Sequence, residues 1–339
     1  MAKFSKTIAA VLLVAGAAGI ASCGGGKGGD GGFKPESQGA PYEIVVVADH
    51  AEWDGPVGDT LRAMFYAPVP MVNRQETVFD VLRTLPDGFR KLVTRHPNVL
   101  IVDIDEKYAE PAIKMAENVY AAPQMVISAT APDEASMAVL VDANRSDIMD
   151  LLENAERARD VADARDHTPE EVAELIRTKF GFEMGMGPGY TVRKEADDFL
   201  WISYETPTGS QGIIIYTYPF SGIKDFDLEN LVTRRDRFAG LIPGENPGSH
   251  MSTNPDFTEL VYRRINDRQW SEMRGFWDVA GDYMGGPYTN YSTLDVAGQR
   301  VVAIDFYVYQ PNPRMSQRNY RKQLEHYLYT VAFPSAAKL

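Results

Sequence analysis

The stretch Gly181-Phe-Glu-Met-Gly-Met-Gly-Pro-Gly189 divides the chain into two halves with different sequence patterns. Glycine adopts backbone angles that other residues avoid, and proline ends helices and strands, so a cluster of both interrupts regular structure. Before it, short apolar runs alternate with helical patterns, and after it strand patterns follow one another. We therefore predict two domains, residues 41–182 and residues 183–339, that differ in fold class.

The half before Gly181 has the pattern of an α/β domain. Tyr42-Glu-Ile-Val-Val-Val-Ala48 is a β-branched run with little alternation, which is typical of a strand covered on both faces. Thr168-Pro-Glu-Glu171 is a capping box that begins a helix, and Gly181 ends it. Because strands alternate with helices, we expect a largely parallel sheet. Further strands are expected at 77–83, 99–102 and 125–127, and helices after Asp54-Gly55-Pro56 and at 87–96, 133–142, 145–165 and 169–180.

The half after Gly189 has the pattern of an α+β domain, an antiparallel sheet that carries two helices. Asn266-Asp267 and the segment around Gly298 are expected to form hairpin turns. Helices are expected near 227–239 and from Ser316, and strands at 190–194, 199–205, 211–218, 257–265, 268–279, 288–294 and 300–310. A meander that opens at Gly189-Tyr190 and ends in a helix resembles the small sandwiches of the PsbP and Mog1 type, which implies a fold and no function.

Residues 1–22 have the pattern of an export signal. Lys3 and Lys6 precede an uncharged apolar run, Ile8 to Ile20, that is too short to span a bilayer. The following Ile20-Ala-Ser-Cys23 resembles the bacterial lipobox, and Cys23 is the only cysteine of the chain. The resemblance implies diacylglycerol on the Cys23 sulfur, cleavage before Cys23 and acylation of the freed amine, for example with palmitate. The alternative is an ordinary secretory signal in which Cys23 lies near the cleavage site by chance.

Residues 23–40 have the composition of a flexible, glycine-rich tether. A glycine-rich phosphate loop is not supported, because no strand precedes the stretch, no helix follows it and no Lys-Ser/Thr pair closes it. By the sorting rule of Gram-negative lipoproteins, aspartate directly after the lipidated cysteine favours the inner membrane. Gly24 stands at that position here and favours the outer membrane. We therefore expect a protein of the cell envelope, anchored to the membrane by the lipid on Cys23.

The charge of the chain excludes some partners. With 34 Lys and Arg against 47 Asp and Glu the formal net charge is −13, and 32 against 47 leaves −15 once Lys3 and Lys6 are removed with the signal. Nucleic acid phosphates and anionic headgroups repel such a body, so we expect no nucleic acid partner. No second cysteine is present to form a disulfide with Cys23.

Asp103 and Asp105 are the strongest catalytic candidates. They end the apolar run that begins at Val99, where open α/β sheets bind their ligands. The pattern is similar to the haloacid-dehalogenase phosphotransferases, in which the first Asp is the nucleophile and the second an acid/base beside Mg²⁺. Glu106-Lys107 departs from that family's continuation, and no later Lys or paired-acid motif follows. The alternative is that both carboxylates leave a strand into solvent or cap a helix.

Other patterns of catalysis are absent from the sequence. The five histidines show no His-x-x-x-His spacing, so no zinc site is expected, and His50 after the first strand is expected to be a hydrogen-bonding loop residue. Gly209-Ser-Gln-Gly212 lacks the G-x-S-x-G spacing of a nucleophile elbow. We expect no metal and no cofactor.

Aromatic residues indicate a candidate binding face in the second domain. Along 301–309, four apolar residues alternate with Ala303, Asp305, Tyr307 and Tyr309, so one strand face is tyrosine-rich. Trp201, Tyr216 and Tyr218 are expected to join it. If exposed, the face would stack sugars or bind a partner protein, and Tyr307 and Tyr309 would be accessible. If covered, it would be the seat of the helix that begins at Ser316.

Several stretches together resemble a family of bacterial lipoproteins known only as domain of unknown function forty-eight thirty-seven. The resemblance implies a lipoprotein of the cell envelope and brings no known activity or functional residues. The matching stretches are Pro41–Asp49, Trp53–Asp59, Asn98–Asp105, Pro123–Ile127, Ala131–Glu134, Gly212–Pro219, Arg274–Trp277, Met284–Tyr288 and Arg318–Glu325.

From the sequence we expect a lipid-anchored envelope protein that binds or scaffolds, with envelope proteins or glycans as partners, and performs no catalysis. The alternative is a Mg²⁺-dependent phosphotransferase or hydrolase that uses Asp103 and Asp105.

Overall fold

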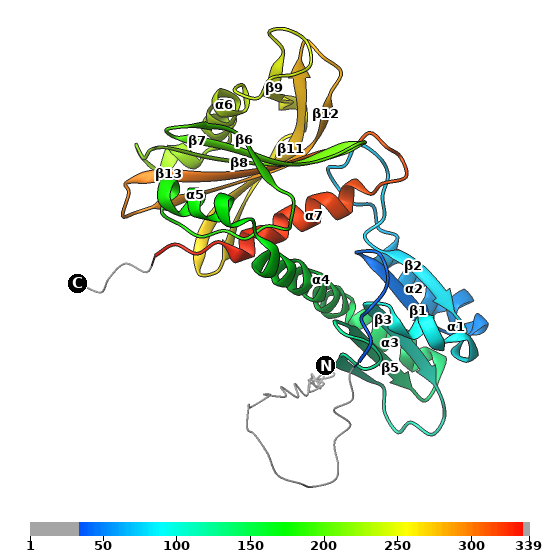
Figure 1. Ribbon diagram of the computed structural model, residues 1–339. Coiled ribbons are helices and arrows are strands. Elements are labelled where there is room, and N and C mark those ends of the chain that lie inside the picture. Colours follow the sequence, from blue (N-terminus) through cyan, green and yellow to red (C-terminus); the bar gives the residue numbers. More distant parts are fainter. Residues whose placement is uncertain (1–33, 335–339) are drawn as a thin grey trace, which may run out of the picture. The chain divides into compact units, whose positions relative to one another are not determined.

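The computed structural model describes residues 34–334, which form two compact units (Figure 1). The first unit comprises the described residues up to Leu61 together with Val81–Ile148, and the second comprises Arg62–Asp80 together with the residues from Met149 onward. The predicted border between residues 182 and 183 therefore lies inside the second unit. The predicted signal, the lipidation site Cys23 and the glycine run 24–32 lie outside the described residues.

The first unit is built on a five-stranded mixed sheet with the order β2-β1-β3-β5-β4. Strands β1, β3 and β5 are parallel, and β4 runs antiparallel to β5. This confirms the predicted α/β class. The strands are β1 (Glu43–Val47), β2 (Asp80–Thr84), β3 (Asn98–Ile104), β4 (Ala112–Glu117) and β5 (Met125–Ala131), and the helices are α1 (His50–Asp54), α2 (Pro56–Phe65) and α3 (Glu134–Ala143).

Three details of the first unit differ from the prediction. Helix α1 was not predicted, and it begins at His50, which was expected to lie in a loop. The expected helix at 87–96 is replaced by two short 3-10 helices, Pro86–Gly88 and Lys91–Arg95. Lys91 has a φ of +55°, a left-handed conformation that interrupts a regular helix. Strand β4 was not predicted, because its side chains are mostly exposed and it therefore lacks the apolar run of a buried strand.

The second unit is built on an eight-stranded antiparallel sheet with the order β10-β11-β12-β13-β8-β7-β6, in which β9 also pairs with β11. This confirms the predicted α+β class. The strands are β6 (Thr191–Ala196), β7 (Phe199–Thr206), β8 (Gly209–Pro219), β9 (His250–Thr253), β10 (Glu259–Ile265), β11 (Arg268–Ala280), β12 (Gly285–Asp295) and β13 (Arg300–Tyr309). The helices are α4 (Arg145–His167), α5 (Glu170–Phe180), α6 (Leu228–Ala239) and α7 (Gln317–Tyr327).

Both faces of this sheet are covered, by different helices (Figure 1). On one face, even-numbered residues of β13 such as Ile304 and Phe306 pack with Leu324 of α7 and Phe180 of α5. On the other face, odd-numbered residues such as Tyr307 lie in a cluster with α6. Because α5 buries its apolar side in the core of this sheet, it belongs to the second unit and not to the α/β unit before it.

A buried ion pair connects α6 to the sheet. The Arg235 guanidinium donates to the Asp305 carboxylate at 2.7 and 3.2 Å, and neither side chain is exposed. The same guanidinium donates to Thr253 Oγ1 at 2.9 Å and lies 3.7 Å from the ring centre of Tyr288. Burial opposes ionisation, but the facing Asp305 carboxylate nevertheless raises the pKa of Arg235. Burial also raises the pKa of Asp305, and its contacts with Arg235 and Asn290 oppose that increase. The two side chains connect α6 to β13.

Helix α7 is joined to α4 by a second charged cluster. Nδ1 of His326 lies 2.6 Å from Asp160 and its Nε2 lies 3.3 Å from Glu153, which also binds Lys322 at 2.8 Å. Burial alone would lower the pKa of His326, but the two carboxylates outweigh it and raise that pKa. His326 is thus a structural cation of the α4–α7 contact.

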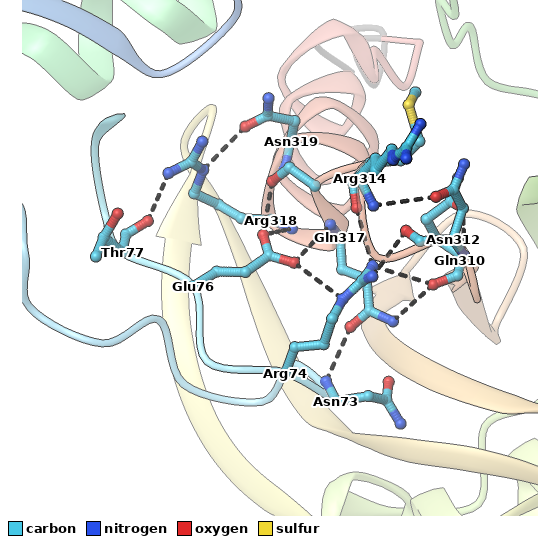
Figure 2. Close-up of polar contacts among 12 residues, drawn as sticks. Asn73, Arg74, Glu76, Thr77, Gln310, Asn312, Arg314, Gln317, Arg318 and Asn319 are labelled. Carbon is cyan, nitrogen blue, oxygen red and sulfur yellow. Dashed lines mark hydrogen bonds and ion pairs between the residues drawn. The ribbon is translucent and has the colours of Figure 1, made fainter. Parts of the chain in front are cut away.

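The segment Arg62–Asp80 caps the start of α7 (Figure 2). The Glu76 carboxylate accepts hydrogen bonds from Ser316 Oγ at 2.6 Å, from the Gln317 amide at 2.8 Å and from the Arg318 amide at 2.9 Å. The first amides of a helix have no partner within the helix and carry partial positive charge. Glu76 therefore satisfies the first turn of α7 from a segment about 240 residues earlier in the chain.

Arg74 binds the loop that leads into α7 (Figure 2). Its guanidinium donates to the carbonyl oxygens of Asn312 at 2.7 Å, Met315 at 2.9 Å and Gln310 at 3.2 Å. A single planar guanidinium with five donors can satisfy several carbonyls at once, which a lysine cannot do with the same geometry. Arg74 thus binds the loop before α7, and Glu76 binds the first turn of α7 itself.

We expect Asp305→Asn to destabilise the second unit by about 3 kcal/mol or more, because it leaves the buried Arg235 without a counter-charge. Urea unfolding followed by tryptophan fluorescence is the measurement, since Trp201, Trp270 and Trp277 lie in the second unit and only Trp53 lies in the first. The control is Asp267→Asn, which removes an exposed ion pair with Arg264 at a position of positive φ that asparagine tolerates. Equal losses in both variants would contradict the assigned role of Arg235 and Asp305.

We expect Glu76→Ala to lower the free energy of unfolding by about 1–2 kcal/mol, because the first amides of α7 lose their acceptor. Hydrogen exchange resolved to peptides should show faster exchange at Gln317 and Arg318. Glu170→Ala is the matched control, because Glu170 is also an acidic residue in a first helical turn, that of α5, but its side chain is largely exposed. Unchanged exchange at the start of α7 would show that Glu76 is not its cap.

Candidate functional site

The face of the sheet that α6 covers contains a hollow of about 440 Å³. Its floor and walls come from β7, β11 and β13, and the segment after α6 closes one side with Ile242 and Pro243. The volume lies within the range of small-molecule sites. The side chains that line it are mainly apolar or aromatic and include Trp201, Glu205, Ile242, Met251, Trp277, Val279, Met284, Tyr307 and Tyr309.

The aromatic walls of the hollow are held by hydrogen bonds at their polar atoms. Nε1 of Trp201 donates to Oη of Tyr307 at 2.8 Å, and Nε1 of Trp277 donates to the Val308 carbonyl at 3.2 Å. The ring centres of Trp277 and Tyr307 are 5.5 Å apart at an interplanar angle of 75°, and those of Trp277 and Tyr309 are 6.3 Å apart at 57°. Because both indole donors are bonded within the protein, the two tryptophans offer a ligand their hydrocarbon and π surfaces.

Two glycines make room for these rings. A Cβ at Gly212, which pairs with Tyr307 across β8 and β13, would lie 1.9 Å from Cε1 of Tyr307. A Cβ at Gly286 would lie 1.9 Å from the Val308 carbonyl oxygen and 3.1 Å from Nε1 of Trp277. A side chain at either position would therefore displace a wall of the hollow.

Glu205 supplies the carboxylate at the hollow. Its Oε1 accepts from Ser203 Oγ at 2.7 Å and lies 4.0 Å from Nη2 of Arg193, and about half of the side chain is exposed. Burial raises the pKa of Tyr307, the hydrogen bond from Trp201 opposes this, and the negative charge of Glu205 adds to the increase. Tyr307 is therefore a neutral phenol and not a base.

The structure brings together part of the predicted aromatic face. Trp201, Tyr307 and Tyr309 line the hollow. Tyr216 and Tyr218 do not, because they are buried near α6, where Tyr216 stacks on Phe238 at 4.4 Å and Tyr218 lies below Arg234 at 4.7 Å. Whether the face binds a ligand stays a prediction.

Of the two alternatives for this face, the structure supports the covered one, because Tyr307 is only 3% exposed and Tyr309 is partly buried. The expected covering helix is wrong. The helix that covers the face is α6 and not the Ser316 helix, because the alternation of β13 directs its tyrosines away from the side on which α7 packs. The covering is incomplete beyond Tyr307, and the hollow lies there.

Most of the other lining residues were not predicted from the sequence, among them Glu205 and the four side chains Trp277, Met251, Met284 and Ile242. For Trp277 a signal was present, because it alternates with Met273 and Val279 along β11 and so shares their face. The other three line the hollow because the segment after α6 and the loop before β12 pack against the sheet. This packing joins distant segments, so no local sequence pattern predicts it.

A larger hollow of about 570 Å³ lies on the same unit, beside the 3-10 helix Ile223–Phe226. Two of its walls, Ile223 and Tyr262, are 79% and 61% exposed, so it is an open depression of the surface. Its cation Arg268 already donates to the Leu294 carbonyl at 2.8 Å. We therefore regard the smaller, aromatic hollow as the better candidate site.

Asp103 and Asp105 lie at the carboxyl end of β3, as expected from the sequence, but they are paired locally. Asp105 accepts from the Lys107 amide at 2.9 Å and lies 2.9 Å from its ammonium group, and these contacts lower the pKa of Asp105. Asp103 accepts a hydrogen bond from the Tyr108 hydroxyl, which raises the pKa of Tyr108. Within residues 34–334, no group of three or more His, Cys, Asp or Glu side chains is arranged to hold a metal ion. Nδ1 of His50, at the start of α1, lies 2.9 Å from the Arg83 guanidinium.

The geometry defines an α/β unit and an α+β unit, and the second contains a hollow with aromatic walls. Residues 170–330 match the family described as "Domain of unknown function (DUF4837)", and residues 37–163 match a second family, "Domain of unknown function (DUF8532)". The family resemblance predicted from the sequence is confirmed for residues 170–330, whereas the resembling stretches between residues 41 and 134 lie in the second match. Comparison with curated proteins gives no match.

Among solved structures, the chain is similar to a point mutant of "Protein Mog1" with a TM-score of 0.30 and 8% sequence identity, over 44% of this chain and 89% of that one. No helix in the described part of the chain combines the length and the apolar character needed to cross a bilayer.

Proposed function

We propose that this chain is a lipid-anchored protein of the cell envelope, held at the outer membrane through Cys23, that binds a ligand and catalyses no reaction. The aromatic hollow of the second unit is the proposed binding site. The observation that carries this proposal is the set of four aromatic side chains around one hollow, with both tryptophan donors already bonded. Such walls favour the apolar or π surface of an envelope glycan, a protein side chain or a small molecule.

The residues around the hollow favour binding over catalysis. Among the described side chains that line it, Glu205 is the one carboxylate, and histidine and cysteine are not represented. Histidine and carboxylates are among the side chains that act as general acids and bases, and Glu205 alone represents them among the described lining residues. The alternative, a phosphotransferase that uses Asp103 and Asp105, gains no further support, because Lys107 and Tyr108 occupy both carboxylates.

The anchor is tested by Cys23→Ser. We expect the parent protein to sediment with membranes and the variant to be soluble, because each buried CH₂ contributes about 0.8 kcal/mol and two or more chains are needed for stable anchoring. Mass spectrometry of the mature amino terminus should find the lipid on Cys23. Gly24→Ala is the control and should remain with the membrane fraction. A Cys23→Ser protein that sediments as the parent does would contradict the anchor.

The pocket is tested with N-phenyl-1-naphthylamine, a neutral dye that fluoresces in apolar surroundings. We expect binding to the parent and its loss in Ser210→Trp, because Ser210 lines the hollow and a tryptophan there would fill it. Tyr283→Ala, which removes a fully exposed tyrosine that does not line the hollow, should bind as the parent does. Equal dye binding by the parent and Ser210→Trp would place the dye elsewhere and contradict the proposed site.

A further inference from the structure

Four aromatic rings line the hollow, those of Trp201, Trp277, Tyr307 and Tyr309. The ring of Trp277 is inclined by 75° to that of Tyr307 and by 57° to that of Tyr309. Trp277 and Tyr307 are buried, and Trp201 and Tyr309 are partly exposed. The face of an aromatic ring carries negative potential, so rings that surround a point from different directions stabilise a cation there. Among the described residues, no arginine or lysine of the chain stacks on any of the four rings. Their faces are therefore not used by the protein's own cations.

Charge at the hollow has the complementary sign. Glu205 lies at the hollow with about half of its side chain exposed. Its Oε1 is 4.0 Å from Nη2 of Arg193, the cation with which it pairs. The Arg193 guanidinium is itself directed to Ser203, to which its Nε donates at 2.7 Å. The Glu205 carboxylate is therefore partly open to a ligand beside Arg193, in a chain whose net charge is −13.

The hydrogen bonding of the walls selects among cations. Both indole donors and the hydroxyl of Tyr307 are bonded within the protein. A primary ammonium or guanidinium placed against the four rings could donate to Glu205, but each donor that faced a ring would exchange a hydrogen bond to water for a π contact, which is costly. A quaternary ammonium has no N–H donor to lose, and its methyl groups fit apolar walls. The chemistry thus favours a quaternary cation over lysine-like or arginine-like groups.

We infer that the hollow bounded by Trp201, Trp277, Tyr307 and Tyr309 binds a quaternary ammonium group, with Glu205 as its counter-charge. The inference rests on the proposed function and names the ligand class of the same site. A trimethylammonium group occupies only part of 440 Å³, so the hollow also holds the group to which it is attached. The shared chemistry is that of choline, present both in soluble compounds and in lipid headgroups.

The test compares ligands of equal shape and different charge on the full mature chain in a nonionic detergent. Choline and tetramethylammonium are titrated against its tryptophan fluorescence, and 3,3-dimethylbutan-1-ol, the neutral analogue of choline, is titrated in parallel. We expect choline to bind about ten-fold more tightly than the neutral analogue, as cation–π contacts with several rings predict. Tyr309→Leu should weaken choline binding while the neutral analogue binds as before.

Glu205→Gln tests the counter-charge. We expect it to weaken choline binding several-fold and to leave the neutral analogue unaffected. Glu195→Gln is the matched control, because Glu195 is a half-exposed carboxylate of β6 that pairs with Lys179 and does not line the hollow. It should bind choline as the parent does.

The outcomes separate the two proposals. If the neutral analogue binds as tightly as choline, the quaternary ammonium inference is overturned and the hollow remains a binding site. If neither compound nor the naphthylamine dye binds, both proposals fail. Sedimentation of the Cys23→Ser chain with phosphatidylcholine vesicles, and not with phosphatidylglycerol vesicles, would support the inference with a lipid headgroup as the source. Choline binding in solution without vesicle binding would support it with a soluble ligand.

Discussion

The buried contact between Arg235 and Asp305 decides how the second unit uses the two faces of its sheet. Removing two charges from water is costly, and the cost is offset only when the groups meet in a defined geometry with their other donors satisfied. Here Thr253, Asn290 and the ring of Tyr288 complete that geometry. Helix α6 therefore has one favourable position, over the odd-numbered residues of β13. The hollow lies where this covering ends, so its place follows from the same contact.

Local sequence signals predicted the helices of this unit and its strands except β9. Asn266-Asp267 forms the expected turn, with φ of +48° and +60° at the two residues that join β10 and β11. Gly181 ends α5 in the left-handed conformation, with a φ of +69°. Both positions require backbone angles that few residues adopt, so the sequence and the conformation are tightly linked. The alternation of β13 likewise predicted two faces of different composition.

The arrangement of those elements could not be predicted in the same way. A strand's alternation shows that a face is buried but does not identify the helix that buries it, and here α6, not the Ser316 helix, covers the tyrosines. The partners Arg235 and Asp305 are 70 residues apart, and Glu76 is 240 residues from Ser316. Each of these residues is of a type that usually lies at the protein surface. Their roles arise from contacts between distant segments, which a pattern within one segment does not record.

The same distinction explains what was found of the site. Three of its four aromatic walls were predicted from β7 and β13, whereas Trp277 comes from β11 and depends on Gly286 for space. Gly212 and Gly286 leave room for the rings of Tyr307 and Trp277, and hydrogen bonds from Trp201 and Trp277 hold the walls in place. Ordering flexible side chains costs free energy on binding, so walls that are already ordered leave more of the interaction energy for affinity. A fixed set of rings also binds one ligand shape better than others. This rigidity favours a compact group such as a trimethylammonium over a flexible chain that would need the walls to adjust.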